Sequence, residues 1–91
     1  MTKLEEFLSC LRAIDAEAID LAERKNRDYG DSWAEEGVIG VIIRMGDKLK
    51  RMKTITDEGH TIQVKDEGLR DTLMDLRNYA GMAVAYIDGY R

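Results

Sequence analysis

Proline is absent from this 91-residue chain, and aromatic residues make up only 7% of it. These two shortages disfavour a small β-barrel and leave helices as the expected secondary structure. The single cysteine, Cys10, cannot form an internal disulfide, and no apolar run approaches the roughly 18 residues that a membrane span needs. The N-terminal segment also lacks the apolar core of a signal peptide. The sequence therefore predicts a cytoplasmic protein without a membrane segment.

The charge balance is acidic, with 18 Asp and Glu against 14 Lys and Arg. A formal net charge of -4 provides no overall basic field that would hold a duplex by releasing its counterions. Bulk nucleic acid is therefore not an expected partner. Hydrophobic residues make up 44% of the chain, which excludes intrinsic disorder.

A chain of 91 residues is long enough for one domain, which we expect to span residues 1–91. A domain of this size buries only about 60 to 65% of the surface of its unfolded chain, so its stability as a monomer is marginal. The small size and marginal stability of the domain favour a homo-oligomer, in which a second subunit covers apolar surface.

Apolar residues at alternating spacings of three and four predict a first helix from Leu4 to about Arg27. Thr2 and Glu5 have the spacing of a capping box at its start. A second apolar stripe predicts a helix that ends near Gly59 and has Gly37 and Gly40 at its beginning. The members of the two stripes are Leu4, Phe7, Leu11, Ile14, Ala18 and Leu21, and then Val38, Ile42, Met45, Leu49 and Met52.

A third helix is predicted after a short extended piece at Thr61–Val64, with Asp66 as its N-cap and Gly89 near its end. Its apolar stripe consists of Leu69, Leu73, Leu76, Ala80, Ala83 and Ile87. The expected fold class is all-α, a three-helix antiparallel bundle completed by homo-oligomerisation.

The stripe of the first helix continues in register to Lys25 and Asp28, which are charged. One interpretation is that the helix end protrudes into water and Lys25 lays its methylene groups over the core. The other is that the two charges are ligands. Next to them, Tyr29 and Trp33 flank a flexible glycine and could stack on a base, although Trp33 could equally fill the end of the bundle.

Helical geometry puts Arg44, Asp47, Lys48 and Arg51 on one face of the second helix, opposite its apolar stripe. The plain interpretation is a solvated charged face. A cluster of Arg and Lys around one carboxylate would also suit phosphate oxygens.

The third helix carries Glu67, Asp71, Asp75 and Asn78 at spacings of four, four and three residues. Carboxylates in this arrangement could share Mg²⁺, an ion that prefers oxygen ligands and often binds beside phosphates. A solvated acidic face is the alternative. However, the segment 79–87 is apolar on nearly every side, which favours a subunit interface and places the acids in a cleft.

Three segments together resemble the nucleotide modification associated domain type 1 family. They are Lys25-Asn26-Arg27-Asp28-Tyr29-Gly30-Asp31-Ser32-Trp33, Asp47-Lys48-Leu49-Lys50-Arg51, and Asp66-Glu67-Gly68 with Asp75-Leu76-Arg77-Asn78-Tyr79. Proteins of this family occur largely in phages, prophages and bacteria and are linked to nucleotide or base modification by genomic association. The resemblance covers roughly residues 20 to 85.

The chain is more distantly similar to the all-α MazG-like nucleoside triphosphate pyrophosphohydrolases, whose helix acids bind Mg²⁺. Their Glu-Glu-x-x-Asp pattern has a counterpart here in Asp66, Glu67 and Asp71. Their Glu-x-x-Glu pattern does not, because Arg44 and Asp47 stand at the matching positions. Two-metal catalysis would lose a ligand, whereas phosphate binding through Arg44 and Lys48 would remain.

These observations lead to two hypotheses. In the first, Mg²⁺ positions a water that hydrolyses a nucleoside triphosphate to monophosphate and pyrophosphate. In the second, a non-catalytic oligomer binds or sequesters a nucleotide, including a cyclic or modified one, or regulates a partner enzyme. A structural phage component is a third possibility.

The first hypothesis depends on the acids of the third helix, whereas in the second the basic residues of the second helix matter more than those acids. The expected catalytic residues are Glu67, Asp71 and Asp75, and the expected metal ligands are these three with Asp47. The expected ligand-binding residues are Lys25, Asn26, Asp28, Tyr29, Trp33, Arg44, Lys48, Arg51, Asn78 and Tyr79.

Overall fold

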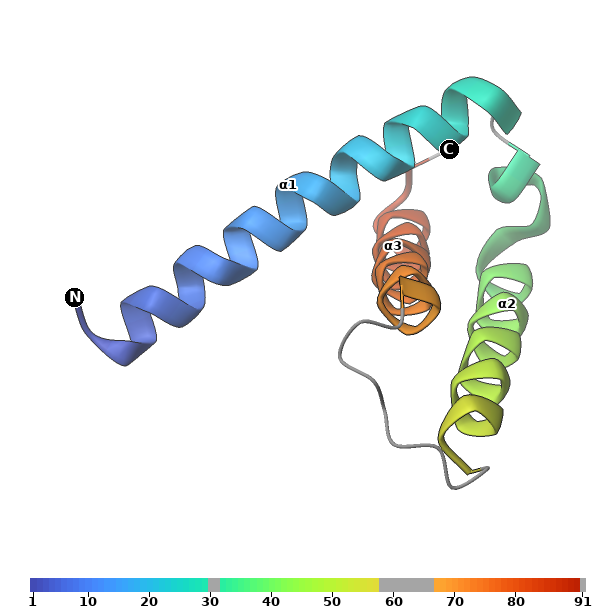
Figure 1. Ribbon diagram of the computed structural model, residues 1–91. Helices are drawn as coiled ribbons and strands as arrows, with labels where there is room; N and C mark the ends of the chain where they lie inside the picture. The colour runs from blue at the N-terminus through green and yellow to red at the C-terminus, as the bar shows by residue number, and fades with distance from the viewer. Residues whose placement is uncertain (30–31, 58–66, 91) are drawn as a thin grey trace. The chain divides into compact units, whose positions relative to one another are not determined.

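The computed structural model consists of three helices, α1 (Lys3–Tyr29), α2 (Ser32–Asp57) and α3 (Glu67–Ile87), as Figure 1 shows. It describes the backbone of residues 1–29, 32–57 and 67–90, and the side chains of residues 1–27, 35–54 and 68–90. No strand occurs in these ranges, so the all-α prediction is confirmed for them. The predicted extended piece Thr61–Val64 and the predicted caps Gly59 and Asp66 lie outside the described residues. Within the described ranges, no helix is both long and apolar enough to cross a bilayer.

The chain divides into two compact units, Met1–Gly30 and Asp31–Arg91. The first unit is the 27-residue helix α1. Its start confirms the predicted cap, because the backbone N–H of Glu5 donates to Oγ1 of Thr2 over 3.1 Å. Near its other end, Arg27 and Glu23 form an ion pair of 3.3 Å across one helical turn. The helix continues two residues past the predicted end at Arg27.

In the second unit, α2 begins at Ser32, earlier than the sequence pattern predicted. Its first turn is separated from the rest by Gly37, which has φ 70° and ψ −170°. Only glycine adopts this combination readily, because a Cβ would clash with the backbone. Gly37 therefore marks a break inside α2 rather than its beginning.

The end of α3 is confirmed at Gly89, which has φ 99°. The N–H of Gly89 donates to the carbonyl of Tyr86, and the N–H of Tyr90 donates to the carbonyl of Ala85. This pair of hydrogen bonds is the Schellman motif, in which a left-handed glycine satisfies the last carbonyls of a helix.

Helices α2 and α3 pack side by side as an antiparallel hairpin (Figure 1). Gly37 lies opposite Tyr86, and Arg44 interacts with Tyr79. Lys48 pairs with Asp75, which lies one turn before Tyr79. Each step forward along α2 matches an equal step backward along α3, so one register runs through the hairpin. We call the row of residues through which each helix meets the other its contact stripe. The contact stripe of α2 also contains Val41, which is almost completely buried.

The contact stripes are not the apolar stripes that the sequence pattern singled out. On both helices, the apolar stripe lies one residue C-terminal to the contact stripe, for example Ile42 after Val41 and Leu76 after Asp75. Because the helices are antiparallel, the same one-residue step turns toward the same side of the hairpin. We call this side the apolar face. It consists of Val38, Ile42, Met45, Leu49, Met52, Leu69, Leu73, Leu76, Ala80, Ala83 and Ile87.

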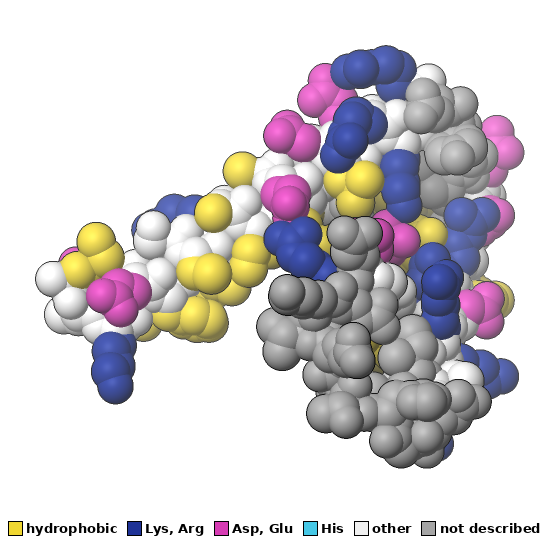
Figure 2. All heavy atoms as spheres, in the orientation of Figure 1, with side chains coloured by type: hydrophobic (Ala, Val, Ile, Leu, Met, Phe, Trp, Pro, Cys, Tyr) yellow, Lys and Arg dark blue, Asp and Glu magenta, His cyan; other side chains and the backbone are white. Residues whose placement is uncertain are grey.

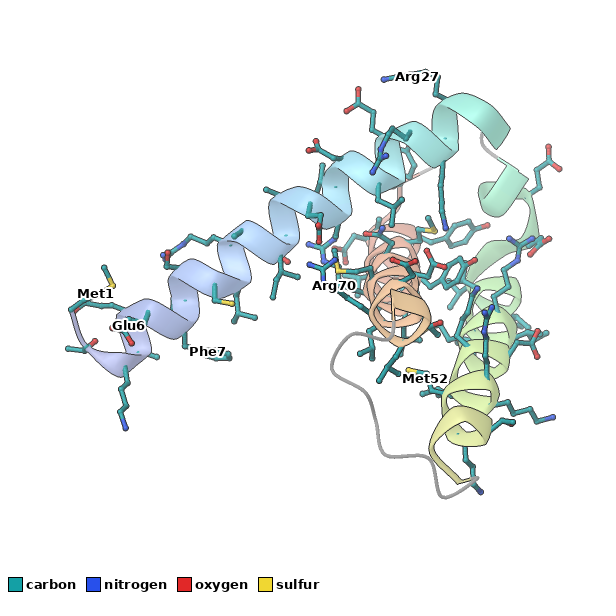
Figure 3. All side chains as sticks on the ribbon, in the orientation of Figure 1. Met1, Glu6, Phe7, Arg27, Met52 and Arg70 are labelled. Atoms are coloured by element: carbon teal, nitrogen blue, oxygen red, sulfur yellow. The ribbon has the colours of Figure 1, made fainter. Side chains whose placement is uncertain are left out.

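Much of the apolar face is open to solvent. Ile42 is 55% exposed, and Leu49, Leu73 and Ile87 are exposed as well. Met52 is half-buried and reaches toward α3 (Figure 3). The contacts between α2 and α3 include Gly37 with Tyr86 and Lys48 with Asp75, and the exposed apolar residues lie beside them.

Candidate functional site

A charged pair crosses the hairpin near the middle of α3. Nζ of Lys48 lies 3.4 Å from Oδ2 of Asp75. The two side chains are only 25% and 15% exposed, so both charges are partly withdrawn from water. A charge in such a position needs a partner, and each provides one for the other. The sequence placed both residues in the candidate site, and the structure brings them together.

Arg44 lies one turn before Lys48 on α2 and makes further polar contacts. Its Nη2 donates to Oε1 of Glu36 over 2.7 Å. The hydrogen bond and the negative charge of Glu36 raise the pKa of Arg44, and Tyr79 on α3 adds a smaller hydrogen-bond contribution. Arg44 is thus a permanent cation held between the first turn of α2 and the side of α3.

We call Glu36, Arg44, Lys48, Asp75 and Tyr79 the polar cluster. Two glycines permit its geometry. At Gly40, a Cβ would collide with Cβ of Glu36 and would lie 2.9 Å from its Oε2, so a side chain there would displace the partner of Arg44. At Gly37, a Cβ would lie 3.4 Å from the Tyr86 hydroxyl, and the positive φ disfavours any side chain. The break at Gly37 separates Glu36 from the regular part of α2, where Arg44 lies.

Further polar residues of α3 lie beside the polar cluster. Asn78 is 8% exposed and accepts a hydrogen bond of 3.2 Å from Arg77. Thr72 is also buried, and its hydroxyl donates to the Gly68 carbonyl over 2.6 Å. The Thr72 hydroxyl is therefore satisfied within its own helix, and Asn78 lies one residue before Tyr79 of the polar cluster.

Helical geometry gathers the remaining charged candidates on one side of the hairpin. The positions one residue N-terminal to the contact stripes face away from the apolar face, and they include Asp47 on α2 and Asp71 on α3. Both residues are exposed, as is Arg51. The hairpin thus has an apolar face and an opposite side that carries acids next to the polar cluster.

Within the described side chains, no group of three Asp, Glu, His or Cys residues lies close enough to hold a metal ion. Asp75 has Lys48 as its neighbour, and Asp71 is exposed one turn earlier. The fourth expected ligand, Glu67, has its backbone in α3 but its side chain outside the described set.

The structure describes only some of the candidate ligand-binding residues near the end of α1. Lys25 and Asn26 are exposed on α1. Asp28 and Tyr29 at the end of α1 and Trp33 in the first turn of α2 have helical backbone, but their side chains lie outside the described set.

Sequence reasoning missed two residues that complete the site. Glu36 binds Arg44 across the break in α2, a spacing of eight residues that a continuous helix would not bring together. Tyr86 lies against Gly37 from the far end of α3. Gly37 was the one available signal, since a glycine just inside a helix can mark a close approach of another chain segment.

Chemically, the arrangement offers two cations one turn apart, a phenol and an amide, with carboxylates beside them. These are the groups that bind phosphate oxygens directly or through a metal ion. The fold and site thus define a small helical hairpin protein with a charged polar side. The family model for nucleotide modification associated domain 1 matches residues 25–87, so the chain belongs to that family. No curated protein and no solved structure matches the chain.

Proposed function

We propose that this protein binds a nucleotide, or a similar phosphorylated small molecule, at the polar side of the α2–α3 hairpin. The observation that carries the proposal is the pairing of Lys48 with Asp75 next to the Arg44 contacts. These cations are held in place on neighbouring turns, so a phosphate chain could bridge them with little loss of side-chain freedom. All five members of the polar cluster also lie inside the family match.

The first form of this function is Mg²⁺-dependent hydrolysis of a nucleoside triphosphate to monophosphate and pyrophosphate. Asp71 and Asp75 lie one turn apart on α3, a spacing that allows both to reach one hydrated ion. Asp47 lies on the same side of the hairpin, and Glu67 precedes Asp71 by one turn. Lys48 would leave Asp75 when the metal binds and would then neutralise charge on the phosphates.

The second form is binding without turnover, as a sponge for a nucleotide, cyclic and modified ones included, or as a regulator of a partner enzyme. The Lys48–Asp75 ion pair favours it, because Lys48 already occupies the carboxylate that a metal would need. In this form the ligand would replace Asp75 as the partner of Lys48. The acids would then tune the affinity for the ligand rather than activate a water molecule.

Either form is proposed to operate in a homo-oligomer. The apolar face spans both helices of the hairpin. Its exposed members are Ile42 and Leu49 on α2 and Leu73 and Ile87 on α3. We propose that the same face of a second copy covers it and completes a four-helix bundle with the polar sides outward. The double variant Ile42→Ser/Leu49→Ser should then reduce the mass measured by light scattering. Ile43→Ser, exposed on α2 but off the apolar face, is the matched control.

The function is tested by incubating the protein with Mg²⁺ and a panel of canonical and modified nucleoside triphosphates and cyclic dinucleotides. Chromatography of the products then separates hydrolysis from binding. Lys48→Met and Asp71→Asn test the site. Lys50→Met on α2 and Asp88→Asn after α3 are matched controls, because both residues are exposed and lie outside the polar cluster.

Three results are distinguishable. Release of pyrophosphate that Asp71→Asn abolishes and Asp88→Asn retains supports hydrolysis. A ligand that is recovered intact with the protein, and lost in Lys48→Met but not in Lys50→Met, supports the binding form. If no nucleotide in the panel binds or changes, the proposal is rejected.

A further inference from the structure

The N-terminal half of α1 carries an apolar stripe that is open to solvent. Leu4, Phe7, Leu8 and Leu11 are all exposed, and Phe7 is 57% exposed. Figure 2 shows hydrophobic side chains gathered along this half of the helix, and Phe7 projects away from it in Figure 3. The family match begins at Lys25, so this stripe belongs to the part of the chain outside the match.

The spacing of the stripe is that of a coiled-coil seam. Leu4, Leu11 and Ala18 repeat every seven residues, and Phe7, Ile14 and Leu21 repeat between them. Such a pattern on a helix fits a second helix of the same kind, because side chains at these positions interlock across the seam. Lys25 and Asp28 then occupy the next two seam positions, which ends the apolar part of the seam.

We propose that the N-terminal half of α1 pairs antiparallel with the same segment of a second copy of this chain. In the proposed register, Leu4 of one copy lies level with Ile14 of the other, and Phe7 lies level with Leu11. Every seam position in this overlap is apolar. Beside the seam, Lys3 lies opposite Glu17 of the other copy at both ends of the overlap, which supplies two pairs of opposite charge.

Burial and charge disfavour the competing alignments, since a shift by one heptad would need Ala18, which is fully buried, in the seam. An antiparallel shift by one heptad brings Lys3 opposite Arg24, a repulsive pair. A further shift places Phe7 against Lys25 and Leu4 against Asp28. Parallel pairing stacks Lys25 on its own copy within the seam and gives Lys3 no acidic partner. The proposed register is the antiparallel one that keeps the seam apolar and matches opposite charges.

Cys10 lies beside the centre of this overlap and is exposed, which makes it a reporter. In the proposed pair, the two copies of Cys10 lie on the same side of the seam and near its two-fold axis. A short bismaleimide should therefore link the full-length protein into a covalent dimer. The control variant is Cys10→Ser/Ser9→Cys, which moves the thiol by one residue to the outer side of α1 and should lose most of the cross-linking.

The register is tested by charge reversal, with assembly measured by sedimentation in the absence of nucleotide. Lys3→Glu should weaken the association by about tenfold, and Lys3→Glu/Glu17→Lys should restore it. In the Ile42→Ser/Leu49→Ser background, which removes the proposed hairpin interface, Phe7→Asp/Leu11→Asp should halve the mass of the assembly while the helical circular dichroism signal is retained.

Three results would overturn the proposal. They are equal cross-linking of the thiols at positions 9 and 10, no recovery in the double charge reversal, or a mass unchanged by Phe7→Asp/Leu11→Asp. The last result would also be expected if the stripe packs within its own chain. None of these measurements involves nucleotide, so their outcome is independent of the nucleotide binding proposed above.

Discussion

Lys48 and Asp75 face each other across the α2–α3 hairpin with 3.4 Å between Nζ and Oδ2, at positions where most helical hairpins have apolar side chains. Their neighbours along the same register are Arg44 with Tyr79 and Gly37 with Tyr86. The hairpin therefore holds its charged residues between its helices and its large apolar residues on a flank.

The Lys48–Asp75 pair should show measurable coupling in a double-mutant cycle. Lys48→Met and Asp75→Asn should each lower the free energy of unfolding, and the coupling between them should be about 1 kcal/mol because both side chains keep some contact with water. Urea unfolding followed by circular dichroism measures it. A coupling of zero would mean that the pair does not form in solution.

Two glycines of α2 should respond in opposite directions to the same substitution. Nothing lies within 4 Å of a Cβ at Gly46, so Gly46→Ala should raise the free energy of unfolding by about 0.5 to 1 kcal/mol through helix propensity. Gly40→Ala meets the Cβ of Glu36 and should lower it while weakening nucleotide binding through Arg44. Thermal unfolding and binding titrations check both. Equal stabilisation by the two changes would argue against the Glu36–Arg44 contact.

Gly37→Ala should destabilise the hairpin. The conformation of Gly37, with φ 70° and ψ −170°, costs a residue with a side chain about 1 to 3 kcal/mol. If Tyr86 also restricts the space, Tyr86→Ala should recover part of the loss in the double variant. A Gly37→Ala protein as stable as the unmodified chain would show that α2 is continuous.

The C-terminal cap of α3 provides another matched pair. Gly89 has φ 99° in the Schellman motif, so Gly89→Ala should lower the free energy of unfolding by about 1 kcal/mol. Gly81→Ala lies in open space within the same helix and should raise it. Chemical denaturation of the two variants side by side tests the sign of each effect.

Local signals in the sequence predicted the helices well because they act within a few residues. Thr2 caps α1 and Gly89 ends α3 as expected, since each contact involves neighbours in the chain. The break at Gly37 was placed at the start of the second helix, because glycine marks both starts and breaks. The sequence could not show that the turn before it is also helical.

The way α2 and α3 pack was harder to predict. Apolar periodicity identified Ile42 and Leu73 as members of the two stripes, but not which residues make the contact between the helices. In the hairpin the contact stripes are offset from these apolar stripes by one residue, and Lys48 and Asp75 make the contact instead. A single sequence does not show which residues of an amphipathic helix will lie between the helices of a hairpin.

The charged pair at the centre of the hairpin also determines how its helices align. Both contact stripes repeat every heptad, so sliding α2 along α3 by one heptad would still bring the two stripes face to face. One such slip would set Lys48 opposite Met82, and the opposite slip would set Asp75 opposite Val41. Either would leave a charge buried against an apolar side chain. The ion pair thus selects one alignment from several that apolar packing alone would tolerate.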